Sequence, residues 1–197
     1  LGAKPDGDLL DARAARCCRA LTNAYFSAQT HSFMGGVQGA DAFGLDIGLG
    51  DERTFLNLVR KYAALGMFDT GIFGTEILTR VLFKMGAPEL AASLMAGDKK
   101  VSYGRMRAAG ATRLWENWNG EGSHSHPMFG APSALLFSHI LGIRQKEGSC
   151  GWERAVISPF LPSFLHRVSG HITTPRGTVS VACEREKSRM KVTAAIS

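Results

Sequence analysis

Residues 69–90 read DTGIFGTEILTRVLFKMGAPEL, and this stretch decides the fold. A helix is predicted from about Thr75, because apolar residues recur at spacings of three and four along one face: Ile77, Leu78, Val81, Leu82 and Met85. Gly86 can end this helix, and Pro88 suits the first position of the next one. A connection this short makes the two helices antiparallel neighbours.

The same punctuation recurs on both sides of this hairpin. Asp51 is a good N-cap for a helix that ends at Gly66, with an inward stripe predicted at Phe55, Val59, Tyr62 and Ala63. Further helices are predicted over residues 9–28, 40–49 and 129–141. The first two-thirds of the chain therefore read as successive helical hairpins.

After Gly148 the hydrophobic period changes from helical to two. Strands are predicted over residues 154–158, 165–173, 178–184 and 190–196. Thr174–Gly177 has Pro second and Gly fourth, which is typical of a type I turn, and a looser turn is predicted at residues 186–189. The fold class is thus mainly α with a β tail, either an α-toroid or an α-solenoid followed by an antiparallel β unit.

Composition excludes several classes of function. The net charge is +6, but the Lys and Arg residues are scattered and form no basic stripe, so no nucleic-acid partner is predicted. No apolar run approaches the roughly 20 residues that span a bilayer, so no membrane partner is predicted. The four cysteines, Cys17, Cys18, Cys150 and Cys183, lack zinc or disulfide spacing and are interpreted as free thiols. We predict no metal and no cofactor.

One loop carries residues suited to sugar chemistry. Residues 110–119 read GATRLWENWN, which places Glu116 between Trp115 and Trp118, and SHSHP follows with His126. Indole faces stack on the apolar faces of sugars, and lower hydration can tune a carboxylate as an acid or base. The simpler alternatives are core packing for the tryptophans, a solvated Glu116, and a capping, packing or metal-binding His126.

These segments resemble the C-terminal half of the catalytic domain of α-L-rhamnosidases, the family-78 glycoside hydrolases. The matching stretches begin at about Phe33 and are DTGIFGTEILTRVLFKMG (69–86), VSYGRM (101–106), GATRLWENW (110–118), SHSHPMFGA (123–131), LGI (141–143) and TTPRGTVSV (173–181). The GAT-x-LWE-x-W motif followed by S-x-S/N-H-P is the specific part of the resemblance, and the other segments are weak alone.

The resemblance implies an (α/α)6 toroid with a C-terminal β-sandwich. Residues 1–148 would then form a partial toroid on the side of the catalytic base, and residues 149–197 an incomplete antiparallel β domain. It also implies hydrolysis of terminal α-L-rhamnosyl linkages with inversion, which uses two carboxyl groups roughly 6.5–9.5 Å apart. The catalytic base falls on Glu116 and the pocket histidine on His126, while Trp115 and Trp118 would support substrate binding.

The chain departs from the family at the general acid, whose acidic, arginine-rich motif has no counterpart here. Asp41, Asp46 and Asp51 stand in other contexts. We therefore expect a glycosidase fragment with weak or no activity alone, whose partners are a rhamnose-containing substrate and a missing N-terminal half. The alternatives are a non-catalytic carbohydrate-binding or assembly subunit, and a helical interaction protein. Burial of the Glu116 carboxylate separates a structural role from a site at a concave surface.

Overall fold

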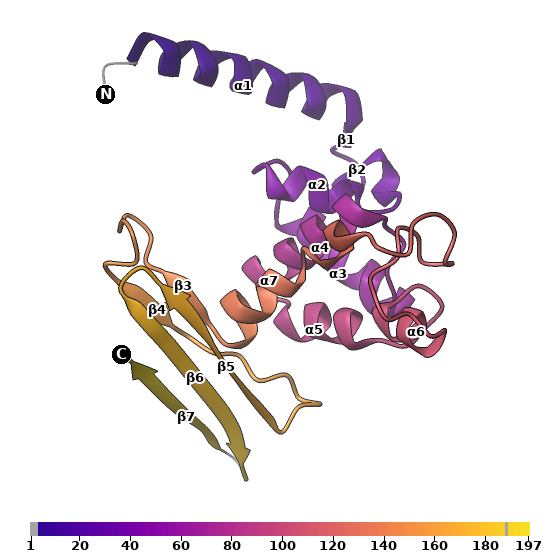
Figure 1. The fold of residues 1–197 in the computed structure, drawn as a ribbon. Helices are drawn as coiled ribbons and strands as arrows, with labels where there is room; N and C mark the ends of the chain where they lie inside the picture. The colour runs from indigo at the N-terminus through magenta and orange to yellow at the C-terminus, as the bar shows by residue number, and fades with distance from the viewer. Residues whose placement is uncertain (1–3, 188) are drawn as a thin grey trace.

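The computed structural model describes residues 4–187 and 189–197, and it has a helical body followed by β-strands (Figure 1). The α-helices are α1 (Lys4–Tyr25), α2 (Ala40–Asp46), α3 (Glu52–Leu65), α4 (Ile72–Lys84), α5 (Pro88–Ala96), α6 (Tyr103–Ala108) and α7 (Ser133–Leu135). Shorter elements are β1 (Phe26–Ser27), β2 (Ser32–Phe33), the 3-10 helices η1 (Met34–Gly36) and η2 (Pro127–Gly130), and the π-helix η3 (Leu136–Ile140).

The central hairpins begin and end at the residues that the sequence indicates. The Asp51 side chain caps α3 in a capping box with Thr54, and Gly66 ends α3 in the left-handed conformation with φ 60°. Pro88 opens α5 as predicted. Helix α4 instead starts at Ile72, three residues before the predicted Thr75. The hydroxyl of Thr75 is buried against that of Thr70 at 2.9 Å, so Thr75 packs inside the first turn and does not cap it.

The helical core centres on side chains that are almost completely buried: Leu58, Tyr62, Phe68, Leu78 and Leu82. Phe55 and Val59 are half-buried against it, but Ala63, which we had placed on the inward stripe, is exposed. The predicted apolar face of the first helix is also wrong as a buried face. Helix α1 stands apart from the other helices (Figure 1), and Leu10 on it is 62% exposed.

The last predicted helix, over residues 129–141, is broken into η2, α7 and η3. Pro127 begins η2 and Pro132 precedes α7, and a proline supplies no backbone N–H to continue a helix. Helix α6 and the short strands β1 and β2 were not predicted. Gly142, with φ 69°, ends the segment as expected.

The C-terminal part contains β3 (Ile143–Gln145) paired with β4 (Ala155–Ile157), and a three-stranded antiparallel sheet. That sheet has the order β5 (Arg167–Thr174), β6 (Gly177–Glu186), β7 (Arg189–Ile196). The predicted Thr174–Gly177 turn joins β5 to β6. The turn predicted at residues 186–189 includes Ser188, which lies outside the described residues.

The buried face of the sheet is contributed by β6, where Val179, Val181 and Cys183 pack with Leu141 and Ile143. Strand β3 was not predicted, and its pairing with β4 crosses the boundary that we placed at residue 148. We therefore propose that the division between the two parts lies before Ile143.

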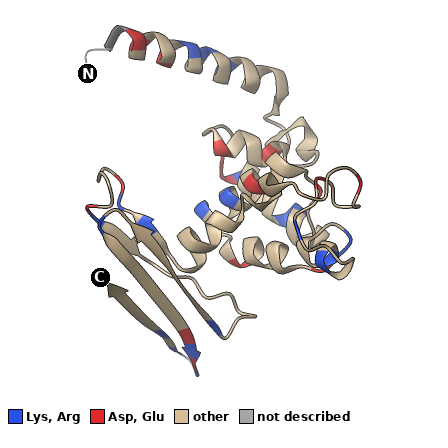
Figure 2. Cartoon of the chain, viewed as in Figure 1, with Lys and Arg blue, Asp and Glu red and all other residues tan. Residues whose placement is uncertain are grey.

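Charged residues are distributed over α1, the helical body and the β-strands without one basic face (Figure 2). The described residues include no helix that is both long and apolar enough to cross a membrane. All four cysteines are free, with Cys183 buried.

Candidate active site

Glu116 lies in a loop of residues 114–126, which we call the Glu116 loop. Two backbone hydrogen bonds fold this loop back on itself: the Glu116 N–H donates to the Ser123 carbonyl at 2.8 Å, and the His126 N–H donates to the Leu114 carbonyl at 2.7 Å. Within the bend, the Asn117 side chain donates to the Glu121 carbonyl at 3.0 Å. The loop is therefore held by its own backbone although it contains no regular helix.

The Glu116 carboxylate is fixed on one oxygen and open on the other. Its Oε2 accepts the Ser123 N–H at 2.9 Å, and His126 Nδ1 lies 4.0 Å from the same atom. The Glu116 side chain is 42% exposed. Among the described residues, Oε1 receives no hydrogen bond, so it remains available to a water or a hydroxyl. This arrangement fits a functional carboxylate better than a buried structural one.

Gly122 makes the position of this carboxylate possible. Its φ of +81° is in the left-handed region, and an added Cβ would lie 2.7 Å from Glu116 Oε2. The sequence analysis did not select Gly122. The signal was the glycine in EGS directly before the Ser123 whose N–H binds Glu116.

Trp115 has one partner within the loop and one outside it. Its ring stacks on His124 with centroids 5.0 Å apart, and its N–H donates to Met106 Sδ at 3.4 Å. The ring is half-buried, so part of it is open beside Glu116.

Trp118 points into an aromatic cluster. Its ring stacks on Phe68 at 5.7 Å and meets Tyr103 and Phe129 edge-on at 5.1 and 4.3 Å. Its indole Nε1 donates to the Thr70 carbonyl at 2.7 Å, directly before α4. Trp118 therefore anchors the Glu116 loop to the first turn of α4.

His126 closes the loop beside Glu116. Its side chain is 22% exposed and its imidazole faces the carboxylate, while Pro127 after it begins η2. Capping of the helix, the simpler alternative, is absent: the His126 side chain makes no cap hydrogen bond to η2.

The three aspartates upstream have structural partners. Asp41 is buried and accepts hydrogen bonds from Ser32 Oγ and the Phe33 N–H, and burial raises the pKa of its carboxyl. Asp46 forms an ion pair with Arg80, whose hydrogen bond lowers the Asp46 pKa. Asp51 caps α3.

A second set of contacts, missed in the sequence, secures the loop before α4. Tyr62 donates its hydroxyl to Asp69 and to the Gln38 carbonyl, and Lys61 pairs with Asp69 at 2.6 Å. Burial, with the hydrogen bond to Asp69, raises the pKa of the Tyr62 hydroxyl well above its ordinary value. The Thr70 carbonyl that receives Trp118 is thereby held by α3. No regular spacing in the sequence marks such a network.

No group of three or more His, Cys, Asp or Glu side chains within residues 4–187 and 189–197 is arranged to hold a metal ion. The site therefore offers one partly exposed carboxylate, a neighbouring imidazole and a half-buried indole. Such a set can accept a proton from water and line a sugar face.

Comparison with known proteins places this arrangement in a family. The family described as the bacterial α-L-rhamnosidase six-hairpin glycosidase domain matches residues 1–140. The chain belongs to this family. The resemblance seen in the sequence and the predicted six-hairpin architecture are thereby confirmed.

Two relatives carry the name α-L-rhamnosidase. The protein of Alteromonas sp. (strain LOR) is 32% identical over 124 residues, which cover 57% of this chain and 13% of the relative. A protein of Formosa agariphila is 26% identical over 200 residues, covering 93% of this chain and 21% of the relative. The chain thus spans about a fifth or less of the length of these rhamnosidases.

Two solved structures share the fold. The α-L-rhamnosidase of Dictyoglumus thermophilum has a TM-score of 0.89 at 24% identity, covering 99% of this chain and 23% of its own. That of Streptomyces avermitilis, solved in complex with L-rhamnose, has a TM-score of 0.85 at 23% identity, with coverages of 98% and 20%. The rhamnosidase fold therefore includes both the helical body and the β-strands of this chain.

Proposed function

We propose that this chain forms the catalytic-base side of an inverting glycoside hydrolase that cleaves terminal α-L-rhamnosyl linkages. The observation that carries the proposal is the Glu116 carboxylate, which is oriented by the Ser123 N–H and has its second oxygen open. Membership in the rhamnosidase family supports the substrate class.

In this proposal Glu116 removes a proton from the water that attacks the anomeric carbon. His126 lies close enough to orient that water or a sugar hydroxyl, and a histidine can donate or accept there. Trp115 offers the half-buried ring that borders the sugar. Trp118 supports the site from beneath, through the aromatic cluster and Thr70.

The general acid is proposed to come from an N-terminal half of the toroid supplied by another segment. Asp41, Asp46 and Asp51 are each engaged in structural contacts. An inverting mechanism needs a second carboxyl group opposite the base, and loss of one partner removes most of the rate.

The test compares the purified chain with a reconstituted enzyme. The complementary segment is the N-terminal half of the six-hairpin domain of the Alteromonas sp. α-L-rhamnosidase, coexpressed with this chain. We expect weak or no release of L-rhamnose from an aryl α-L-rhamnoside by the chain alone, and clear release by the complex. Equal release by both samples would contradict the assignment of the acid to another segment.

Gly122→Ala is expected to lower kcat of the reconstituted enzyme by about 100-fold, because a misplacement of about 1 Å can cost that much. The added Cβ would collide with Glu116 Oε2 and the φ of +81° would be strained. The measurement is the initial rate of rhamnoside hydrolysis.

Gly110→Ala is the matched control for this change. Its φ is +90°, but a Cβ there meets no atom within 4 Å. It shares the backbone strain and leaves Glu116 untouched, so similar losses in both variants would argue against the role given to Gly122.

A further inference from the structure

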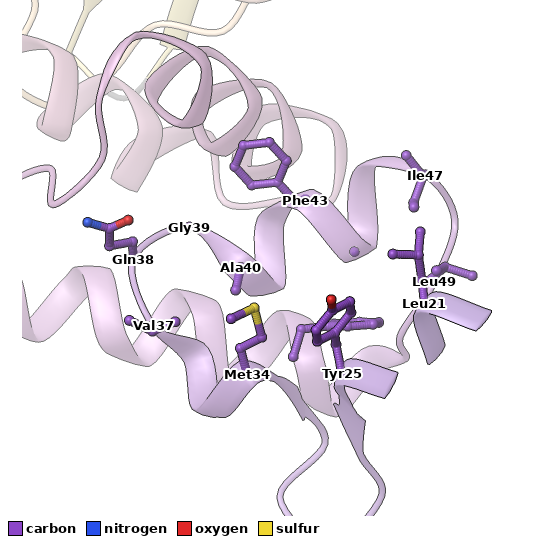
Figure 3. Close-up of a pocket in the computed structure, with 12 residues that line it drawn as sticks. Leu21, Tyr25, Met34, Val37, Gln38, Gly39, Ala40, Phe43, Ile47 and Leu49 are labelled. Carbon is purple, nitrogen blue, oxygen red and sulfur yellow. The ribbon is translucent and has the colours of Figure 1, made fainter. Parts of the chain in front are cut away.

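An apolar groove of about 480 Å³ lies between the C-terminal end of α1 and α2 (Figure 3). We call it the α1–α2 groove and define it by six side chains: Leu21, Tyr25, Met34, Val37, Phe43 and Ile47. All six are exposed, from 39% for Leu21 to 59% for Met34. Scattered apolar side chains are ordinary on a surface, but a contiguous set around a hollow indicates an interaction site.

The groove has the shape of a seat for a helix. Leu21 and Tyr25 are four residues apart on α1, and Phe43 and Ile47 are four apart on α2, so each pair lies on one helical face. In Figure 3 the side chains of these two pairs border the same open space. Two such stripes match the apolar anchors of an amphipathic helix, which recur at spacings of three, four and seven.

The floor of the groove is packed and already formed. Phe33 is 5% exposed and lies beneath α2, where a Cβ on Gly44 would come within 2.3 Å of its ring. Gly44 therefore lets the ring sit under the helix. A rigid floor needs no rearrangement when a partner binds, which lowers the cost of association.

Only one side of α2 is covered within this chain. Helix α2 packs on α3 and α4 and buries Ala42, while Phe43 and Ile47 face the groove. Each inner helix of a closed ring of hairpins has neighbours on both sides. The family is a six-hairpin domain, yet described residues up to 140 form only the pairs α2–α3 and α4–α5 with the shorter α6 and α7.

We propose that the α1–α2 groove is the docking surface for an amphipathic helix of the N-terminal half of a six-hairpin domain. This rests on the proposed function, which assigns that half to another segment. Solved relatives are longer chains, of which this one covers 20–23%, so helices able to fill this position exist in the family. The occupant presents large apolar side chains, because Gln38 and the Tyr25 hydroxyl are the few polar groups at the groove.

The experiment measures binding of the complementary segment from the Alteromonas sp. rhamnosidase to the full chain. Phe43→Asp and Ile47→Asp each place a charge in the groove, and both side chains are exposed, 45% and 52%, so the fold should survive. Phe164→Asp is the matched control, since Phe164 is 48% exposed and does not line the groove. Circular dichroism checks that every variant and the segment are helical.

We expect a 1:1 complex by light scattering, and an increase in Kd of about tenfold or more for Phe43→Asp and Ile47→Asp, because charge at a buried hot spot is costly. Phe164→Asp should bind as the unmodified chain does. Absence of a complex with a helical segment, or binding unaffected by both groove variants, would overturn the proposal. A homodimer of this chain that Phe43→Asp disrupts would overturn it too, because a second copy would then be the occupant.

Binding and catalysis fail separately in this design. Glu116→Gln leaves the groove intact, so it should bind the segment normally even if the chemistry is lost. A complex that forms through the groove but releases no L-rhamnose would count against the proposed function and leave the docking surface supported.

Discussion

Glu116→Gln is expected to reduce hydrolysis of an aryl α-L-rhamnoside by the reconstituted enzyme about 10²- to 10⁴-fold, the range that general acid–base catalysis contributes. The glutamine amide has the shape of the carboxylate, and its oxygen can still accept the Ser123 N–H that now binds Oε2 at 2.9 Å. The loop should therefore keep its conformation. What is lost is the ability to take a proton from the attacking water.

Glu121→Gln serves as the control for this variant. Glu121 is an exposed carboxylate in the same loop, and only its backbone takes part in the loop's hydrogen bonds, through its carbonyl to Asn117 and its N–H to Asn119. It removes the same charge a few residues away. If both variants lost similar activity, the effect would reflect the general electrostatics of the loop and not a base at position 116.

Trp118→Ala is expected to lower the free energy of unfolding of the chain by about 3–5 kcal/mol, the usual cost of deleting a buried aromatic side chain. The variant leaves a cavity among Phe68, Tyr103 and Phe129 and removes the hydrogen bond to the Thr70 carbonyl. The measurement is chemical denaturation followed by circular dichroism.

Trp115→Ala is the comparison that separates the two tryptophans. Trp115 stacks only on His124 within the loop and lies outside the aromatic cluster, so a loss of about 1 kcal/mol is expected. Equal losses in both variants would contradict the division into an anchor and a ring that borders the sugar.

The extent to which the sequence predicts this fold can be read from particular elements. Asp51, Gly66 and Pro88 act through local backbone chemistry, and the hairpins they delimit are where they were expected. The buried face of α1 and the long helix over residues 129–141 were wrong. Burial of α1 depends on neighbours that periodicity does not reveal, and the prolines at 127 and 132 interrupt an otherwise helical pattern.

The candidate site was predictable in composition more than in geometry. The motif around Glu116 led to the rhamnosidase family, which the comparisons confirm. The roles of Ser123, Gly122 and Thr70 depend on one backbone N–H, one positive φ and one carbonyl. Backbone groups are the same in every residue, so their part in orienting a side chain appears only in the structure. The assignments of Glu116, His126, Trp115 and Trp118 stay predictions.

The most direct test of the central claim, that Glu116 is the base, is chemical rescue of Glu116→Ala in the reconstituted enzyme by sodium azide. Azide attacks the anomeric carbon without losing a proton, and the aryloxide leaves with the electrons of the broken C–O bond, so no base is required. We predict that azide restores aryl rhamnoside cleavage in this variant and yields a rhamnosyl azide of inverted configuration. Failure of azide to accelerate a folded, substrate-binding Glu116→Ala enzyme would contradict the account.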